Sequence, residues 1–345
     1  MPNIKTVGPG REYENLQTWW DAIKTESDAA QWAECYGGGN LGTLDATGHT
    51  FTTTSTDYVN IYAAPGHRHN LVWDTNKAHI DVGDVGNTDT SGIRFHVNFG
   101  RIDGLQIKGE GFVRLLNDYD NSAVNGVGGP YYYSDLLIIG GAGSTSNRCF
   151  TDTYIRGDTS RHGYWRNCTF VNLGYGAMFT QNGSCLYYID NCGFIECGGY
   201  TDFPATRWAL TNFVTHEMKN CYILNTNGMN TIEAVFSIGT VHFTNCYITD
   251  ESISNLVWGQ TDCTENGAAS GQLINVSSDW KTLPDSDFVG AGLDLSSDFT
   301  TDAVGNIRVA PWWIGPYQSS SYDPGLIKFA TERIQFSSNK IVFTA

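Results

Sequence analysis

One short pattern recurs along the middle of the chain and constrains the fold more than any other feature of the sequence. The dipeptide Asn-Cys occurs four times between residues 167 and 246, in a frame that reads apolar, any, Asn/Gly/Asp, apolar, any, apolar. With two degenerate upstream copies, the frame begins at Ile102, Tyr133, Trp165, Ile189, Met218 and Phe243. Steps of 24 to 32 residues, with period-two alternation inside each copy, predict a β-solenoid with one strand of a fixed face per turn.

The repeat also predicts which residues face inward. Successive coils of a parallel β-helix stack about 4.8 Å apart, so equivalent residues form columns along the axis. The residues that begin each frame form one expected core column, and a second contains Leu105, Leu136, Cys168, Cys192, Cys221 and Cys246. The Asn residues tolerate a left-handed turn and can hydrogen-bond from coil to coil. We expect that column to be structural rather than a ligand site.

Composition agrees with an all-β, single-stranded parallel β-helix. The chain of 345 residues has 39 Gly, 18 Tyr and 17 Phe, which is typical of a turn-rich β protein. Residues 37–318 are assigned to the solenoid, and its last recognisable coil is expected near Leu273 to Val276. A solenoid grows by adding coils, so one extended domain accommodates this length.

The two ends differ from the solenoid. Residues 1–36 form an expected N-terminal cap, in which Leu16, Trp19, Trp20 and Ile23 share one face of a short helix that covers the open end of the core. Residues 319–345 contain Ile-x-Phe three times at a spacing of seven, beginning at Ile327, Ile334 and Ile341. Three such short strands cannot bury both faces alone. We expect a small β element that serves assembly or attachment.

Charge and apolar content exclude several partner classes. The formal net charge of −16 argues against nucleic acid, because phosphate binding needs clustered Lys and Arg. No run of 18 apolar residues is visible, so we expect no insertion into a membrane. No N-terminal secretion signal is visible either, so we expect the chain to be made in the cytoplasm. The nine cysteines include no Cys-x-x-Cys pair, which disfavours a metal site. We expect reduced, buried thiols, with oxidation between column neighbours as the alternative.

Several segments resemble a known superfamily. The ladder of Asn-Cys-x-Phe/Ile coils resembles the pectate-lyase-like right-handed parallel β-helix proteins, and Gly305 to Arg308 followed by Trp313 to Gln318 is similar to the segment that ends many of them. The opening from Val7 to Trp19 looks like the entry cap of bacteriophage-encoded β-helix proteins such as tailspikes and fibres. The resemblance implies a right-handed helix and a place in a virion. It implies no activity, since that superfamily includes lyases, hydrolases and non-catalytic proteins.

Two outward columns flank the core strand in the same register. One contains Arg101, Tyr132, Tyr164, Tyr188, Glu217 and His242, and the other contains Asp103, Ser134, Arg166, Asp190, Lys219 and Thr244. Tyrosine rings can stack on sugars, while Arg166, Asp190 and Lys219 can hydrogen-bond hydroxyl or acidic groups. A glycan surface is therefore one interpretation. Ordinary cross-strand charge pairs and stacked rings are the other.

The same columns offer two incomplete sets of catalytic residues. A lyase would use Arg166 or Lys219 as a base, with Asp190 and Glu196 holding Ca²⁺, although few carboxylates cluster there. A glycosidase would use Asp190 and Glu217.

Neither set is complete, so we expect no cofactor and a non-enzymatic role first: a bacteriophage fibre, spike or capsid decoration that binds a surface glycan. A polysaccharide depolymerase of the same fold and a leaderless bacterial adhesin are the alternatives. Expected partners are other virion proteins, a host-surface polysaccharide and further copies of the chain, as a trimer.

Overall fold

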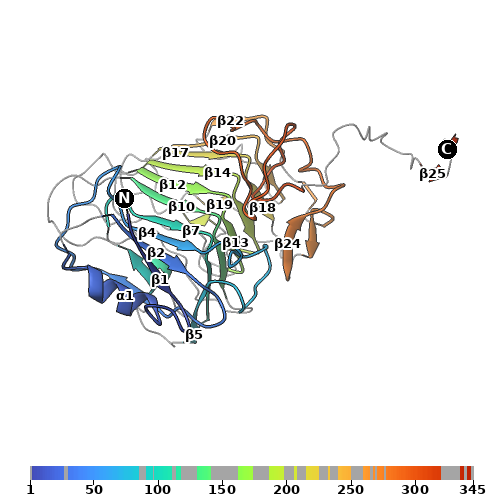
Figure 1. Ribbon diagram of the computed structural model, residues 1–345. Coiled ribbons are helices and arrows are strands. Elements are labelled where there is room, and N and C mark those ends of the chain that lie inside the picture. Colours follow the sequence, from blue (N-terminus) through green and yellow to red (C-terminus); the bar gives the residue numbers. More distant parts are fainter. Residues whose placement is uncertain are drawn as a thin grey trace.

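The computed structural model (Figure 1) places most of the repeat region and both flanks of the solenoid. It describes residues 2–26, 30–84, 91–95, 97–110, 114–117, 130–140, 162–173, 186–197, 206–207, 215–224, 232–233, 240–249, 259–264, 267–268, 270–275, 277–319, 335–337 and 340–342.

The protein is an all-β parallel β-helix, as predicted. One ten-stranded parallel sheet contains β1 (Asn3–Val7), β2 (Gln31–Cys35), β4 (Asn60–Ala63), β7 (Arg101–Asp103), β10 (Tyr131–Ser134), β12 (His162–Arg166), β14 (Leu186–Asp190), β17 (Thr215–Lys219), β20 (Thr240–Thr244) and β22 (Gly259–Thr261). A seven-stranded parallel sheet contains β5 (His79–Asp84), β8 (Gln106–Glu110), β11 (Leu137–Gly140), β13 (Thr169–Val171), β15 (Gly193–Ile195), β18 (Tyr222–Leu224) and β21 (Tyr247–Ile248). Smaller parallel sheets join β3 (Leu44–Ala46), β6 (Ser91–Phe95) and β9 (Arg114–Asn117), and β16 (Thr206–Arg207) with β19 (Ile232–Glu233).

The strand register confirms the predicted core columns. Ile102, Tyr133 and Trp165 are paired neighbours across β7, β10 and β12, and the residues that begin the next three frames continue the same line. All six are buried, as are the four predicted column cysteines. Cys263, two residues after the end of β22, extends the cysteine column by one more coil. The sequence frame does not include this coil, because Gln260 replaces the apolar residue at its start.

The turn between the two large sheets explains the Asn residues. Asp135, Asn167, Asn191, Asn220 and Asn245 each occupy this turn with φ between 50 and 54°. Asn and Asp enter the left-handed region more readily than most residues with a side chain. The column is structural, as expected. Asn167 Nδ2 donates a hydrogen bond to Asp135 Oδ1 of the preceding coil over 2.9 Å, but other side-chain hydrogen bonds of the column go to residues outside the coils.

The N-terminal cap forms as predicted. Helix α1 (Leu16–Ile23) begins after Asn15, whose side chain accepts a hydrogen bond from Thr18 N, and it buries the predicted apolar face. Its Trp20 indole also donates to Thr47 O over 3.0 Å. The capping segment does more than cover the core, because it also supplies β1 and β2, the first strands of the ten-stranded sheet.

The seven-stranded sheet is covered on both sides. Every residue of β11, β13, β15 and β18 is buried, rather than every second one. Their outward side chains form a second apolar cluster, separate from the solenoid core, with residues of the C-terminal region such as Trp280, Phe288 and Ile314. A sheet with two buried faces needs a covering layer, and residues 272–318 provide it.

The predicted last coil near Leu273 is wrong. β23 (Leu273–Asn275) pairs antiparallel with β24 (Asp279–Thr282), so within the described ranges the last strand of the large parallel sheet is β22. Val276 lies outside the described residues. The apolar residues of this hairpin pack outside the solenoid, where Trp280 N also donates to Leu71 O over 3.1 Å.

Residues 284–319, here called the C-terminal strap, run back along the solenoid and bond to the Asn turns. Asn167, Asn220 and Asn245 donate their amides to the backbone carbonyls of Thr301, Leu293 and Ala291, respectively. Arg308 is buried and donates to Gly315 O over 2.8 Å and to Asn167 Oδ1 over 3.3 Å. The segment whose sequence resembles the end of β-helix proteins therefore attaches the C-terminal strap to the side of the solenoid.

The C-terminal repeat is described only in part. β25 (Gln335–Ser337) and β26 (Lys340–Val342) pair antiparallel. The first copy of the repeat, from Ile327, and residue Ile334 lie outside the described residues. Its role in assembly stays a prediction.

Candidate functional site

The predicted outward columns exist in the predicted register. Tyr132 pairs with Arg101 on one side and with Tyr164 on the other, and Tyr164 pairs with Tyr188. The second column likewise runs from Asp103 through Ser134, Arg166, Asp190 and Lys219 to Thr244. These columns lie on the face of the ten-stranded sheet that points away from the core.

The three tyrosines stack on one another. The ring centroids of Tyr132 and Tyr164 are 5.0 Å apart with an interplanar angle of 8°, and those of Tyr164 and Tyr188 are 4.9 Å apart at 10°. Because the faces within this ladder contact each other, a sugar would meet ring edges and hydroxyl groups there. The expected stacking of sugars on these rings is thus restricted by the rings themselves.

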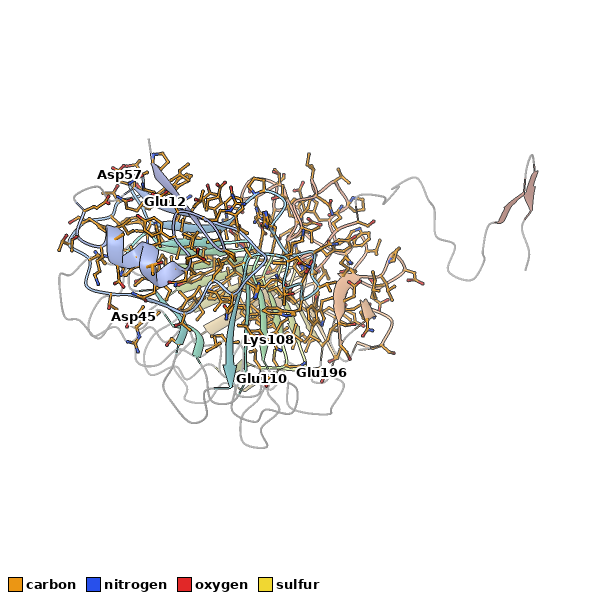
Figure 2. All side chains as sticks on the ribbon, turned by 60° about the horizontal axis from the view of Figure 1, so that its bottom comes forward. Glu12, Asp45, Asp57, Lys108, Glu110 and Glu196 are labelled. Carbon is orange, nitrogen blue, oxygen red and sulfur yellow. The ribbon has the colours of Figure 1, made fainter. Side chains whose placement is uncertain are left out.

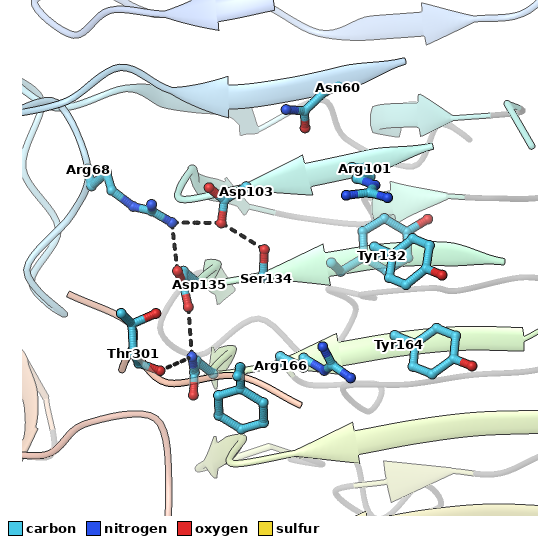
Figure 3. Close-up of a pocket in the computed structure, with 13 residues that line it drawn as sticks. Asn60, Arg68, Arg101, Asp103, Tyr132, Ser134, Asp135, Tyr164, Arg166 and Thr301 are labelled. Carbon is cyan, nitrogen blue, oxygen red and sulfur yellow. Dashed lines mark hydrogen bonds and ion pairs between the residues drawn. The ribbon is translucent and has the colours of Figure 1, made fainter. Parts of the chain in front are cut away.

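A cleft of about 390 Å³ opens beside the first two tyrosines (Figure 3). Tyr132, Tyr164 and Arg166 of the predicted site line it, whereas Tyr188, Asp190, Glu217 and Lys219 do not. The remaining lining residues are Asn60, Arg68, Arg101, Asp103, Tyr133, Ser134, Asp135, Asn167, Phe299 and Thr301. Phe299 and Thr301 belong to the C-terminal strap, so the strap forms one wall.

Arg101 is the cation at the tyrosine side of this cleft. Its Cζ atom lies 3.8 Å from the ring centroid of Tyr58 and 4.9 Å from that of Tyr132. In the described part of the chain, no carboxylate lies within 4.0 Å of its guanidinium nitrogens. Among the residues that the structure describes, the guanidinium is therefore held by aromatic rings and forms no ion pair.

Arg68 organises the opposite side of the cleft. Its Nη2 atom lies 2.6 Å from Asp103 Oδ1 and 2.6 Å from Asp135 Oδ2. Ser134 Oγ donates to Asp103 Oδ1 over 2.7 Å, and Asn167 Nδ2 donates to Asp135 Oδ1. The dashed lines in Figure 3 show this chain of contacts continuing to Thr301 of the strap. The two carboxylates share one nitrogen, so their bonded oxygens are at most twice 2.6 Å apart.

The environment of Asp135 perturbs its ionisation. Burial is the main cause, and the nearby Asp103 charge adds to it, so that the pKa of Asp135 is raised to about 7 although Arg68 opposes the shift. Sequence reasoning missed both Arg68 and Asp135 as site residues. The one available signal was an acidic residue at a turn position that Asn occupies in the next four coils.

Of the four predicted catalytic residues, Arg166 lines the cleft, whereas Asp190, Glu217 and Lys219 lie beyond it on the next two strands, β14 and β17. Arg166 Nε lies 3.9 Å from Asp190 Oδ2, and its Nη2 lies 3.7 Å from Asp298 Oδ1 of the strap. Glu217 Oε2 lies 3.2 Å from Lys219 Nζ. Asp190 occupies its predicted outward column but is not exposed to solvent as an outward position implies: it is only 6% exposed, and its partner Arg166 also contacts Asp298 of the strap.

Burial also raises the pKa of Asp190 to about 6, against the effect of Arg166 and Lys219. Its partner in the predicted glycosidase pair, Glu217, is engaged by Lys219. Among the described residues, no group of three or more His, Cys, Asp or Glu side chains is placed to hold a metal ion. None of the helices in the same ranges is long and apolar enough to cross a bilayer.

Comparisons with known proteins add little to this geometry. No protein-family model matches the chain, and no curated protein matches it. A solved structure of pectin methylesterase from Aspergillus niger is similar over 77% of this chain and 87% of its own, with 12% sequence identity and a TM-score of 0.39.

Proposed function

We propose that the protein binds an acidic glycan in the cleft between the tyrosine ladder and the C-terminal strap. The observation that carries the proposal is Arg101, a cation held between Tyr58 and Tyr132 without a carboxylate neighbour among the described residues. A guanidinium in this setting can form paired hydrogen bonds with the carboxylate of a uronic acid.

The rest of the cleft suits a sugar. Tyr132 and Tyr164 present hydroxyl groups and ring edges, and Asn60 and Ser134 add amide and hydroxyl groups. Acidic residues such as Glu12, Asp45 and Asp57 are exposed on the N-terminal coils and do not line the cleft (Figure 2). A chain with a net charge of −16 repels polyanions at long range, so local cations have to supply the attraction.

A second candidate function is hydrolysis of the bound glycan. Asp103 and Asp135 are bridged by Arg68, and Asp135 is protonated to a substantial degree near neutral pH because its pKa is raised to about 7. A protonated carboxylic acid beside an ionised one is the pairing that glycosidases use. Against this role, Asp103 Oδ1 already accepts hydrogen bonds from Arg68 and Ser134, and the two oxygens of Asp135 accept from Arg68 and Asn167. Binding without turnover is therefore our first proposal.

We further propose that this binding serves a bacteriophage particle, as a fibre, spike or capsid decoration. Support comes from the resemblance of the coil ladder, the opening segment and the end segment to β-helix particle proteins, and from the suitability of a rigid solenoid for such a role. Gold-labelled antibodies against the chain, applied to purified particles of a phage that encodes it, test the location. Label confined to the lysate rather than the particles would contradict it.

Isothermal titration with oligogalacturonates tests the binding proposal, with neutral oligosaccharides of matched length as the comparison. We expect binding of the acidic series only, weakening as salt is raised. Arg101→Gln should weaken binding by about tenfold or more, as expected for loss of a charge-assisted hydrogen bond. Arg94→Gln removes the same charge from β6, where Arg94 Nη1 lies 3.2 Å from Asp45, and should leave affinity unchanged. Equal binding of both oligosaccharide classes, or equal losses in both variants, would contradict the proposal.

A further inference from the structure

The cysteine column has one accessible end among the described residues. Cys168, Cys192, Cys221 and Cys246 are buried on four successive coils. Cys263 follows them on the next coil and is partly exposed. All five thiols are free, so the end of the column offers a thiol to solvent beside a buried one.

Cys246 and Cys263 are neighbours across two paired strands. Thr244 of β20 pairs in parallel with Thr261 of β22, which places the two cysteines opposite each other two residues later. Cys246 N donates to Cys263 Sγ over 3.4 Å, so the sulfur of Cys263 already leans toward its neighbour. Adjacent strands are about 4.8 Å apart, a Cα separation that a disulfide tolerates.

We propose that Cys246 and Cys263 form a reversible oxidation site that closes the last coil with a disulfide. With hydrogen peroxide as oxidant, Cys263 sulfur attacks one peroxide oxygen, which gives a sulfenic acid and water. Cys246 sulfur then attacks the Cys263 sulfur, the S–S bond forms, and the sulfenic oxygen leaves as a second water. In total the two thiols give up two electrons and two protons, and the peroxide is reduced to two waters.

The environment makes this oxidation slow and dependent on pH. A side-chain hydrogen bond with the Cys246 thiol is the main cause that raises the pKa of Cys263, and burial adds to it, whereas the backbone hydrogen bond from Cys246 N lowers it. The thiolate is the reactive species, so the rate should rise as the pH is increased from 7 to 9. The deeper column cysteines are fully buried, which restricts the first attack to the exposed end.

Peptide mapping of the full chain tests the site. The protein is treated with hydrogen peroxide at pH 8, blocked with N-ethylmaleimide, digested and analysed without reduction. We expect one cross-linked peptide pair that contains Cys246 and Cys263 and that dithiothreitol separates. Cys263→Ser and Cys246→Ser should each abolish it, whereas Cys35→Ser, which removes a buried thiol of β2 outside the column, should retain it.

The Cys246→Ser variant distinguishes the oxidation of Cys263 by peroxide from the later formation of the disulfide. Cys263 should still form a sulfenic acid that dimedone traps, since its exposure is unchanged. A cross-link from Cys263 to any other cysteine would overturn the assignment. So would oxidation of wild-type Cys263 that stops at the sulfenic acid, or a failure to oxidise Cys263 under conditions that oxidise exposed control thiols.

Discussion

Arg68 and Asp135 are 67 positions apart in the chain, yet Arg68 Nη2 lies 2.6 Å from Asp135 Oδ2. The contact joins a connecting segment between early coils to the turn of a later coil, and Asn167 carries it on to the strap through Thr301. Arg68 and Asn167, which both bond to Asp135, thus connect three regions that are distant in sequence. The stability of the cleft should depend on it.

Arg68→Ala should destabilise the fold by about 2 kcal/mol, because it leaves the largely buried Asp135 without its cation. The loss should be smaller than for a fully buried pair, because the Arg68 side chain is 31% exposed and solvent screens its charge. Urea unfolding followed by circular dichroism measures the change. Arg94→Ala, which breaks the more exposed pair with Asp45, is the matched control and should cost well under 1 kcal/mol. Equal losses in the two variants would contradict a special role for Arg68.

Stability should fall as the pH rises from about 4 to about 7. The pKa of Asp135 is raised to about 7 in the folded protein, so the folded state retains a proton that the unfolded state releases near pH 4. The resulting stabilisation is complete below pH 4 and is lost as the pH passes the folded pKa. Asp190, whose pKa is raised to about 6, adds to the same trend.

Urea midpoints at several pH values between 4 and 8 measure this slope. Asp135→Asn should make the decline with pH smaller, because the group that releases the proton is gone. Asp57→Asn removes one exposed carboxylate and should leave the slope as it is in the unchanged protein. A slope that Asp135→Asn does not alter would show that Asp135 does not hold the proton.

The sequence allowed the solenoid to be predicted but not the layer outside it. The columns followed from period-two alternation and from the Asn frame, since stacking forces equivalent residues of successive coils to be neighbours. The strap has no such period, and its packing residues, such as Trp280 and Phe288, meet the seven-stranded sheet only in the folded chain. The consecutive apolar residues Leu137 to Ile139 were the available sign that this sheet is buried on both faces.

The prediction of the site was limited in the same way, because the repeat says nothing about residues outside it. The register gave Tyr132, Tyr164 and Arg166 their correct positions because each lies on a strand of the repeat. Arg68 lies outside the repeat, so no periodic pattern predicts its contact with Asp135. Asp190 has its predicted place in the column, but its burial and the contact of its partner Arg166 with Asp298, more than a hundred residues later in the chain, do not follow from the repeat.

Tyr132→Phe should separate ring stacking within the tyrosine ladder from hydrogen bonding of the glycan by the Tyr132 hydroxyl group. The ring stack with Tyr164 is retained, so the free energy of unfolding should change by less than about 0.5 kcal/mol. Loss of a hydroxyl that bonds the sugar should weaken binding of oligogalacturonate about fivefold, as expected for one neutral hydrogen bond. Titration calorimetry measures the affinity. A variant that binds as tightly as the unchanged protein would show that the hydroxyl of Tyr132 does not contact the glycan.

The Asn turns offer a comparison within one column. Asn220 Nδ2 donates to Leu293 O over 2.7 Å, and Asn220 Oδ1 accepts from Leu293 N over 2.7 Å, so its amide holds the strap by two bonds. Asn191 has nearly the same φ, 54° against 52°, but its buried amide has no hydrogen-bond partner among the described residues.

Glycine keeps the left-handed backbone at low cost. Asn220→Gly should therefore destabilise the protein by about 2 kcal/mol, the sum expected for two lost hydrogen bonds, whereas Asn191→Gly should cost less than about 1 kcal/mol. Urea unfolding of the two variants measures the difference, and limited proteolysis should cut the strap faster only in Asn220→Gly. Equal stabilities and equal cleavage rates would mean that the strap is held by its apolar contacts with the seven-stranded sheet rather than by the Asn turn.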